Sequence, residues 1–415
     1  MIRIAGRLAV SVLLACIVSP GCGLSPAAKT PASSPSPLAS PSPTPLPNAN
    51  IVIGQLNLWY YGTGKFGGFE AYDGSGKSIA RIQPLLGEYH SADPAVVRQQ
   101  IDWAADNGVD AFSIEWISPR GEPGSIEDNL DTAFLRAPNL CRVRWLIFFD
   151  FNLHLTQRNI DYSHGVNFDD PQVRTLFIDD LVHLATKYFL QQQYLKIIGR
   201  PVVYVWATWN FKGDVAGAVQ RARQRLLTLG YDVYIVGDEV RSDMFDPVHV
   251  SLWDATTSFI PFLMPGAPPI HTLPAGAIFV DRAFTRWQQK LQGLTVAGRN
   301  DPVAFQPGFT PQYDDTLFRT LNGIGNPTSV QAQSQEEVEN LASVSLAHAT
   351  PVPGTSQRLI WLNTFNNWAE TTTVEPTASA GPKYPAGNYR YDMLNAVSNA
   401  FGSQTYGTGV SSCPA

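Results

Sequence analysis

The sequence has few of the residues from which metal and nucleotide sites are built. Its 415 residues include four cysteines and seven histidines, and none of them stands in an HExxH or a Cys-x-x-Cys motif. Because those spacings are the usual signature of zinc sites, we expect no metal centre. No glycine-rich loop leads from a predicted strand directly into a predicted helix, as nucleotide-binding folds require. We therefore expect no cofactor and no nucleotide ligand.

Charged residues are also scarce. They make up 15% of the chain, the formal net charge is −6, and no block of basic residues occurs. This composition argues against nucleic acid as a partner. No Gly-x-Ser-x-Gly motif stands between a predicted strand and helix, which disfavours a serine esterase. After Val18, no apolar run is long enough to cross a bilayer.

The first residues have the composition of a signal peptide. Arg3 and Arg7 precede the uncharged apolar stretch Leu8–Val18, and small residues follow as far as Gly21. Cys22 comes next and looks like the lipid-attachment site of bacterial lipoproteins. We expect an exported protein that is held at a membrane through lipid on Cys22, with plain secretion as the alternative.

A proline-rich linker and one long domain follow the signal peptide. Residues 22–50 contain eight prolines among serine, threonine and alanine, and Lys29 is their only charged residue. Such a stretch cannot bury enough apolar surface to fold and is held extended by its prolines. We predict a signal peptide at 1–21, a linker at 22–50, a folded domain at 51–402 and a short tail at 403–415.

The cysteines leave one question open. Cys16 leaves with the signal peptide, and if Cys22 carries lipid, Cys141 and Cys413 remain. An exported location permits a disulfide between these two. Two free, separately buried thiols are the alternative.

Strand-like and helix-like segments alternate through the domain. Eight such strands imply parallel pairing through crossover helices, and the count favours a closed (β/α)8 barrel, or TIM barrel, over an open sheet. The predicted strands are Ile51–Tyr61, Val109–Trp116, Arg144–Phe151, Pro201–Trp206, Tyr231–Gly237, Val250–Thr256, Pro302–Gln306 and Leu359–Phe365. The predicted helices are Asp93–Asn107, Ser125–Arg136, Pro171–Leu190, Asp214–Leu229, Ala277–Leu291, Gln335–His348 and Tyr389–Phe401.

Polar and aromatic residues gather where these strands end, which in a barrel is the face that carries the chemistry. Aromatic rings stack on the C–H faces of sugars, while carboxylates and amides bind hydroxyls, so this composition indicates a carbohydrate ligand. For each tryptophan the alternative is a place in the core. The residues predicted to bind substrate are Trp59, Tyr60, Tyr61, Trp116, Trp206, Trp209, Trp253, Asn366, Trp368, Asp314 and Asp315.

The most informative stretch is Leu359–Pro376. Its apolar start predicts a buried strand, and its end carries Asn366, Asn367, Trp368, Glu370 and Glu375. At the end of a barrel strand, these side chains would face the barrel mouth. The alternative is a strand that leads into a helix capped by the hydroxyls of Thr371 to Thr373.

Three segments resemble glycoside hydrolase family 99, the endo-α-mannosidase family. Trp59-Tyr60-Tyr61-Gly62 is similar to the family's aromatic opening. Gly87-Glu88-Tyr89-His90-Ser91-Ala92-Asp93-Pro94 resembles its Gly-x-Tyr-x-Ser-x-Asp-Pro segment. Asn366-Asn367-Trp368-Ala369-Glu370-Thr371-Thr372-Thr373-Val374-Glu375-Pro376 resembles Asn-Glu-Trp-x-Glu-Gly-Thr-x-Ile-Glu-Pro.

The resemblance implies a (β/α)8 barrel that cleaves internal α-mannosidic linkages with retention. It implies that Glu370 is the general acid and base. The position of the glutamate that deprotonates the sugar 2-hydroxyl is occupied here by Asn367, which is not a useful proton acceptor near neutral pH. Glu115, Asp150 or Glu239 would be needed in its place. A carboxylate roughly 6.5–9.5 Å from Glu370 would leave room for a water and predict inversion.

Three functions follow as hypotheses. The first is an exported hydrolase that acts on an α-linked glycan such as mannan, with Glu370 as acid and base. A barrel that binds glycan without cleaving it is the second, since Asn367 lacks a carboxylate. The third is an accessory role in the assembly of surface polysaccharide.

Overall fold

The computed structural model describes residues 50–61, 68–71, 75–119, 125–241, 244–261, 270–378, 389–402 and 413. The chain divides into two units, Met1–Pro45 and Leu46–Ala415, and every described residue belongs to the second. The predicted signal peptide, Cys22, the linker before Asn50 and the tail except Cys413 lie outside the described residues.

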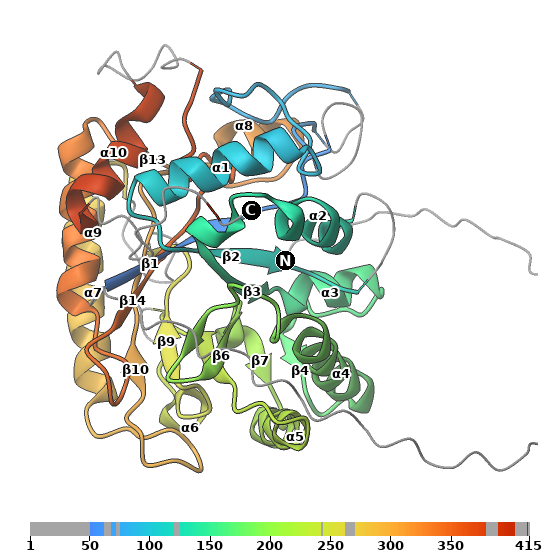
Figure 1. Ribbon diagram of the computed structural model, residues 1–415. Helices are drawn as coiled ribbons and strands as arrows, with labels where there is room; N and C mark the ends of the chain where they lie inside the picture. Colours follow the sequence, from blue (N-terminus) through green and yellow to red (C-terminus); the bar gives the residue numbers. More distant parts are fainter. Residues whose placement is uncertain are drawn as a thin grey trace, which may run out of the picture. The chain divides into compact units, whose positions relative to one another are not determined.

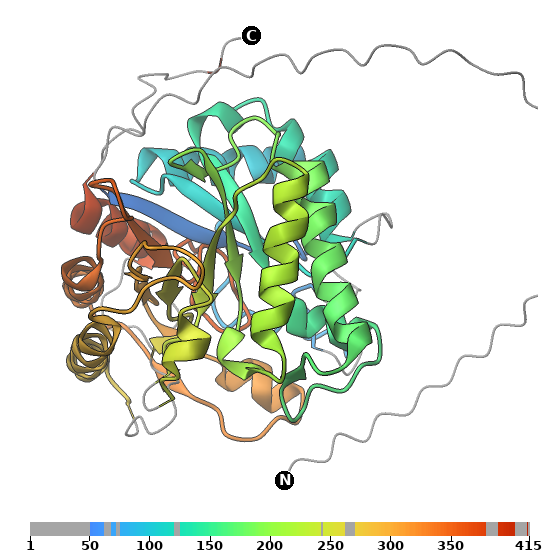
Figure 2. The same ribbon diagram turned by 90° about the horizontal axis from the view of Figure 1, so that it is seen from below.

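The second unit contains a closed barrel of parallel strands (Figures 1 and 2). Neighbouring strands follow the order β10-β9-β8-β6-β3-β2-β1-β14-β11. β10 and β11 are two short pieces of one segment, residues 304–309, and they pair with β9 on one side and β14 on the other. This shared segment closes the sheet, so the predicted TIM barrel is confirmed. Its strands are β1 (Asn50–Leu56), β2 (Ala111–Trp116), β3 (Arg144–Phe149), β6 (Arg200–Val205), β8 (Tyr234–Asp238), β9 (Ala255–Thr257), β10 (Ala304–Phe305), β11 (Gly308–Phe309) and β14 (Arg358–Leu362).

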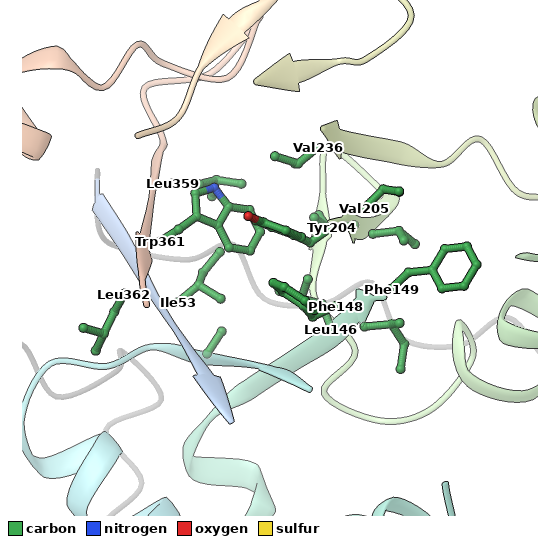
Figure 3. Close-up of a cluster of buried hydrophobic side chains, with 14 of the residues drawn as sticks. Ile53, Leu146, Phe148, Phe149, Tyr204, Val205, Val236, Leu359, Trp361 and Leu362 are labelled. Carbon is green, nitrogen blue, oxygen red and sulfur yellow. The ribbon is translucent and has the colours of Figure 1, made fainter. Parts of the chain in front are cut away.

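Large side chains fill the inside of the barrel. The ring of Phe148 stacks on Tyr204 with centroids 4.4 Å apart, and Tyr204 meets Trp361 edge-on at 4.8 Å (Figure 3). These residues come from β3, β6 and β14, so the core joins strands from opposite parts of the sequence. Because the interior is packed rather than open, a ligand has to bind at the strand ends.

The helices begin where the sequence supplies caps. The carboxylate of Asp93 accepts from the amide of Ala95 at the start of α1, and Asp170 caps α4 in the same way, each just before a proline. Helix α9 packs against both α7 and α10, and α4 packs against α5. Among the described residues, no helix is long and apolar enough to span a membrane. The helices are α1 (Pro94–Asp106), α2 (Ile126–Thr132), α3 (Phe151–Gln157), α4 (Pro171–Tyr188), α5 (Val215–Thr228), α6 (Pro247–Val250), α7 (Leu273–Leu291), α8 (Thr316–Leu321), α9 (Gln335–His348) and α10 (Tyr389–Phe401).

Two predicted strands are wrong in part, because an aspartate caps a short helix near each of them. Val250–Thr256 was predicted as one strand, but Asp246 caps the short helix α6, which ends at Val250. Only the three residues of β9 pair in the sheet. Likewise, β3 ends at Phe149 because Asp150 caps α3. The remaining short strands are β4 (Val166–Asn167), β5 (Lys196–Ile197), β7 (Phe211–Lys212), β12 (Tyr313–Asp314) and β13 (Ser329–Val330).

Other boundaries also moved. The first strand ends at Leu56 rather than Tyr61, since the amide of Asn57 donates to the side chain of Asn366 at 2.7 Å instead of to a neighbouring strand. The predicted helix 125–136 is divided into α2 and a 3-10 turn, Phe134–Arg136. Further 3-10 turns lie at Leu140–Arg142 and Thr208–Asn210.

A disulfide joins Cys141 to Cys413, with 5.7 Å between their Cα atoms. Of the two alternatives left open by the sequence, the structure contains the disulfide.

Because the disulfide spans 272 residues, it removes much conformational entropy from the unfolded chain. Replacing both cysteines with serine should lower the free energy of unfolding by about 2–5 kcal/mol. Urea denaturation measures this loss, and equal midpoints for the two proteins would contradict it.

Candidate functional site

After β14 the chain folds into a compact loop, residues 363–377, which we call the motif loop. Its two halves are joined by a hydrogen bond from the amide of Thr364 to the carbonyl of Thr372, at 3.2 Å. The amide of Phe365 donates to the carbonyl of Gln55 at 2.7 Å, which anchors the loop to β1. No helix begins at Thr371–Thr373, so the alternative reading of these threonines as caps is wrong.

Glu370 lies half-buried in the motif loop, between two neutral hydrogen-bond donors. Its Oε2 accepts from the side-chain amide of Asn367 at 2.8 Å, and its Oε1 lies 3.3 Å from the hydroxyl of Tyr313. Burial, followed by the charge of Asp315, raises the pKa of the Glu370 carboxyl to about 7, although the Tyr313 and Asn367 hydrogen bonds oppose this rise. A carboxylic acid with this pKa can hold a proton at neutral pH and release it to a substrate.

The protonated form of Glu370 fits the hydrogen bonds around Tyr313. The Tyr313 hydroxyl lies 2.8 Å from Asp315, closer than its 3.3 Å to Glu370. Asp315 is paired with Arg319 and accepts from the amide of Thr328 at 2.7 Å, which stabilises its negative charge. Tyr313 has a single hydroxyl proton, so when it donates to Asp315 the Glu370 carboxylate loses one of its two donors. This arrangement favours the protonated form of Glu370, which is the form that can donate a proton.

Asn367 is buried, and its amide is committed to the motif loop. Its Nδ2 donates to Glu370, its Oδ1 accepts from the backbone amide of Glu370 at 3.3 Å, and its own backbone amide donates to Thr364. The side chain therefore orients the carboxyl group of Glu370. A neutral amide in this place cannot take a proton from a substrate hydroxyl.

A second pair of carboxyl groups lies at the ends of β2 and β3. Glu115 and Asp150 are hydrogen-bonded to each other, and Gln55 of β1 donates to Glu115 at 3.0 Å. Burial, together with the charges of Asp150 and Glu370, raises the pKa of Glu115 well above its ordinary value. Burial raises the pKa of Asp150 to about 7, although the helix N-terminus that Asp150 caps favours its anion. Such a pair holds one proton between two carboxyl groups.

Glu239, the third carboxylate predicted to replace the missing base, is engaged elsewhere. Its Oε1 accepts from the indole of Trp253 at 2.7 Å and lies 3.0 Å from the Nδ1 of His249. This buried carboxyl group raises the pKa of His249, although burial of the imidazole opposes the rise. These partners give Glu239 a structural role, and its use as a base stays a prediction.

The tryptophans predicted to stack on sugar separate into two groups. Trp253 packs against Gly237, and the Trp368 indole donates to Tyr89 at 3.1 Å, so both serve packing rather than ligand contact. Trp209 stays partly exposed and lies over Arg241, whose guanidinium is 3.5 Å from the ring centroid. Trp116, Trp253 and Trp368 are fully buried, which favours the alternative of a place in the core. Stacking on sugar stays a prediction for the partly exposed Trp59, Trp206 and Trp209, and for Tyr61.

The predicted polar ligands mostly support the motif loop. Asn366 is buried, accepts from the amide of Asn57 and donates to its carbonyl at 3.0 Å, which ties the loop to the end of β1. The Tyr60 hydroxyl donates to the carbonyl of Asn366 at 2.7 Å. The amide of Asp314 donates to the carbonyl of Glu370 at 2.7 Å, and its carboxylate pairs with Arg81. The hydrogen bonds of these residues hold the motif loop in place, and direct contact with a substrate stays a prediction for Asn366, Tyr60, Asp314 and Asp315.

Sequence reasoning missed the role of Tyr89, whose hydroxyl is hydrogen-bonded to three side chains of the motif loop. The Tyr89 hydroxyl donates to Glu375 at 2.7 Å and accepts from Trp368 and Asn366. Burial raises the pKa of Glu375 to about 8, although hydrogen bonds from Tyr89 and Gln100 oppose the rise. Tyr89 and Glu375 both stand in the motifs that carry the family resemblance, and that signal was available. Asp238, at the end of β8, accepts from the amides of Ala207 and Phe259.

The described residues contain no cluster of histidine, cysteine and acidic side chains fit to hold a metal ion. Residues 62–67 do have the spacing Gly-x-Gly-x-x-Gly of dinucleotide-binding loops, but they lie outside the described residues. The next described helix, α1, begins only at Pro94. In dinucleotide-binding folds the helix follows that loop directly and binds the pyrophosphate.

The sequence of this chain matches a known protein family over residues 171–386, which is more than half its length. The chain belongs to the glycosyltransferase WbsX family. A search of the curated proteins gave no match.

Solved structures share the fold. The endo-α-mannosidase of glycoside hydrolase family 99 from Bacteroides thetaiotaomicron superposes with a TM-score of 0.57 and 16% identity, over 83% of this chain and 95% of that one. The same enzyme with bis-tris-propane gives 0.56 and 15%, over 85% and 95%. A protein described as glycoside hydrolase-like gives 0.61 and 16%, over 88% and 98%. This WbsX family member therefore has a glycoside hydrolase-like barrel.

Proposed function

We propose that this WbsX family member is an exported glycoside hydrolase that acts on an α-linked glycan such as mannan, with Glu370 as its general acid. The observation that supports it most is the setting of Glu370. A half-buried carboxyl group with a pKa raised to about 7 lies between Tyr313 and Asn367, next to the ends of the barrel strands. Endo-α-mannosidases are among the structures that share the fold. Lipid on Cys22 or plain secretion would place the enzyme where it meets extracellular polysaccharide.

The substrate would bind across the strand ends. The partly exposed rings of Trp59, Trp206 and Trp209 are suited to stack on sugar faces. In this proposal Asn367 has two tasks: it orients Glu370 and hydrogen-bonds a sugar hydroxyl close to the scissile bond. The substrate is held by neutral donors and aromatic rings, in keeping with an uncharged polysaccharide.

Two other functions each have one observation in their favour. Asn367, which cannot accept a proton, favours a barrel that binds glycan without cleaving it. The description of the family as a glycosyltransferase favours transfer of a sugar to a growing chain, with an acceptor hydroxyl in the place of water. All three functions use the same site and differ in what reaches the anomeric carbon.

The test is a screen of the purified wild-type protein against α-mannan and α-glucan for both binding and new reducing ends. The Asn367→Glu variant is run beside it. We expect the wild type to release reducing ends from at least one polysaccharide. Binding without release, followed by release in Asn367→Glu, would favour the non-cleaving barrel. New glycosidic bonds from an added nucleotide sugar would favour transfer.

A further inference from the structure

The described site contains the carboxyl pair Glu115 and Asp150, which has no role in a reaction that uses Glu370 alone. Hydrolysis by a general acid also needs a group that removes a proton from the attacking oxygen. Asn367 cannot do this, and Glu239 is occupied by Trp253 and His249. Among the three carboxylates that the sequence proposed as substitutes, Glu115 and Asp150 remain.

The geometry of the barrel places this pair beside the site. Glu115 is the second-last residue of β2 and is in register with Phe148 of β3, while the amide of Asp150 donates to the carbonyl of Trp116 at 3.0 Å. These contacts bring the two carboxyl groups together at the carboxyl ends of neighbouring strands. The side chain of Gln55 holds Glu115 from the adjacent strand, β1.

The same strand connects the pair to the motif loop. Gln55 contacts Glu115 through its side-chain amide and the motif loop through its carbonyl, which accepts from Phe365. Glu115 and Glu370 influence each other's charge, yet no hydrogen bond joins these two described side chains. Both groups therefore belong to the same end of the barrel, Glu370 in the loop after β14 and Glu115 on β2, with β1 between these strands.

We propose that the Glu115–Asp150 pair is the proton acceptor of this site and activates a water molecule for attack on the anomeric carbon. This inference rests on the proposed hydrolase function. One proton is shared between the two carboxyl groups, so the pair carries one negative charge and can take up one more proton. Asp150 is suited to retain charge because it accepts from the amide of Leu153, and Glu115 is held beside it by the side-chain amide of Gln55.

The step balances without any other reactant. The water oxygen forms a bond to the anomeric carbon while one water proton passes to the Glu115–Asp150 pair. The bond from that carbon to the leaving oxygen breaks, its electron pair stays on that oxygen, and Glu370 supplies the proton. Hydrolysis consumes one water, and solvent returns the proton from the pair to Glu370. Because water attacks opposite the leaving group, the product has the inverted configuration.

The test compares Glu115→Gln, Asp150→Asn and a matched control, Glu239→Gln, which is an equally buried glutamate with a structural role. The substrate is whichever of α-mannan and α-glucan the wild type cleaves. We expect kcat to fall about 10²–10⁴-fold in Glu115→Gln with KM changed only a few-fold, and less than 10-fold in the control. Azide added to Glu115→Ala should restore turnover and give the β-glycosyl azide, because this small nucleophile needs no base.

A loss in Glu115→Gln no larger than in Glu239→Gln, or no azide product, would overturn the assignment while leaving Glu370 as the acid. Infrared titration provides a readout without substrate. Several buried carboxyl groups contribute a protonated C=O stretch near neutral pH, and the difference spectrum of wild type minus Glu115→Gln should show that the variant has lost one of these bands. Unchanged absorption in the variant would contradict the shared proton. If the wild type cleaves neither polysaccharide, the hydrolase proposal fails, and the base assignment fails with it.

Discussion

Replacing Glu370 with glutamine is expected to reduce glycan hydrolysis about 10²–10⁴-fold while glycan binding persists. Glutamine has the same shape, with one oxygen that can accept from Asn367 and an amide that can donate to the Tyr313 hydroxyl oxygen, so the motif loop should keep its structure. It has no acidic proton to give to the leaving oxygen. The measurement is the rate of reducing-end release from α-mannan, with the affinity for the same polysaccharide determined in parallel.

The leaving group distinguishes loss of an acid from damage to the site. A dinitrophenolate leaves without protonation, so an α-glycoside of dinitrophenol should lose far less rate in Glu370→Gln than the polysaccharide does. Glu239→Gln serves as the control, since Glu239 is a buried glutamate that is bound to Trp253. Full polysaccharide activity in Glu370→Gln would remove Glu370 from the chemistry.

The folded protein is expected to lose stability as the pH rises from 5 to 8.5. Several buried carboxyl groups have a raised pKa in the folded state: burial raises that of Asp110 and that of Asp238 to about 7, and that of Glu375 from 4.5 to about 8. A group whose folded pKa is raised stabilises the fold fully below its unfolded pKa, and this stabilisation is lost as the pH rises through the folded value. For Glu375 alone the difference amounts to up to about 5 kcal/mol.

A single substitution tests the source of this pH dependence. Glu375→Gln cannot ionise, so its free energy of unfolding should fall less steeply between pH 5 and 8.5 than that of the wild type. Urea denaturation at intervals across this range gives both slopes. A wild-type stability that rises with pH in this window, or identical slopes for the two proteins, would contradict the argument. The acid limit has another origin, because Arg223 and Arg200, which pair with the buried Asp254, lower its pKa.

The barrel could be predicted because its strands are nearly continuous apolar runs between amphipathic helices. The errors in the predicted strand boundaries lie where a helix cap sets the end of an element. The Asp246-Pro247 pair starts a helix that ends at Val250, the first residue of the predicted strand 250–256, and Asp150 ends β3 early. Pro307 has no amide hydrogen, and it separates β10 from β11 within one strand position. The capping aspartates and Pro307 are visible in the sequence, but the apolar runs beside them favour longer strands.

The site was predictable only in part, since contact between distant residues depends on register. Glu370 and Asn367 stand three residues apart in one motif, so the sequence alone predicts that they lie close together. The contact of Glu115 with Asp150 required the pairing of β2 with β3, and no local pattern gives that pairing. Burial of a tryptophan is equally non-local: Trp253 and Trp209 look alike in sequence, yet one is in the core and the other is partly exposed.

The configuration of the first product tests most directly whether Glu370 acts with the Glu115–Asp150 pair. Proton NMR recorded in the first minutes of α-mannan hydrolysis, before mutarotation, distinguishes the two anomers of the new reducing end. An acid at Glu370 and a water-activating base at Glu115–Asp150 predict that the β-anomer appears first. First appearance of the α-anomer would contradict this arrangement and place the attacking group within the substrate or the motif loop.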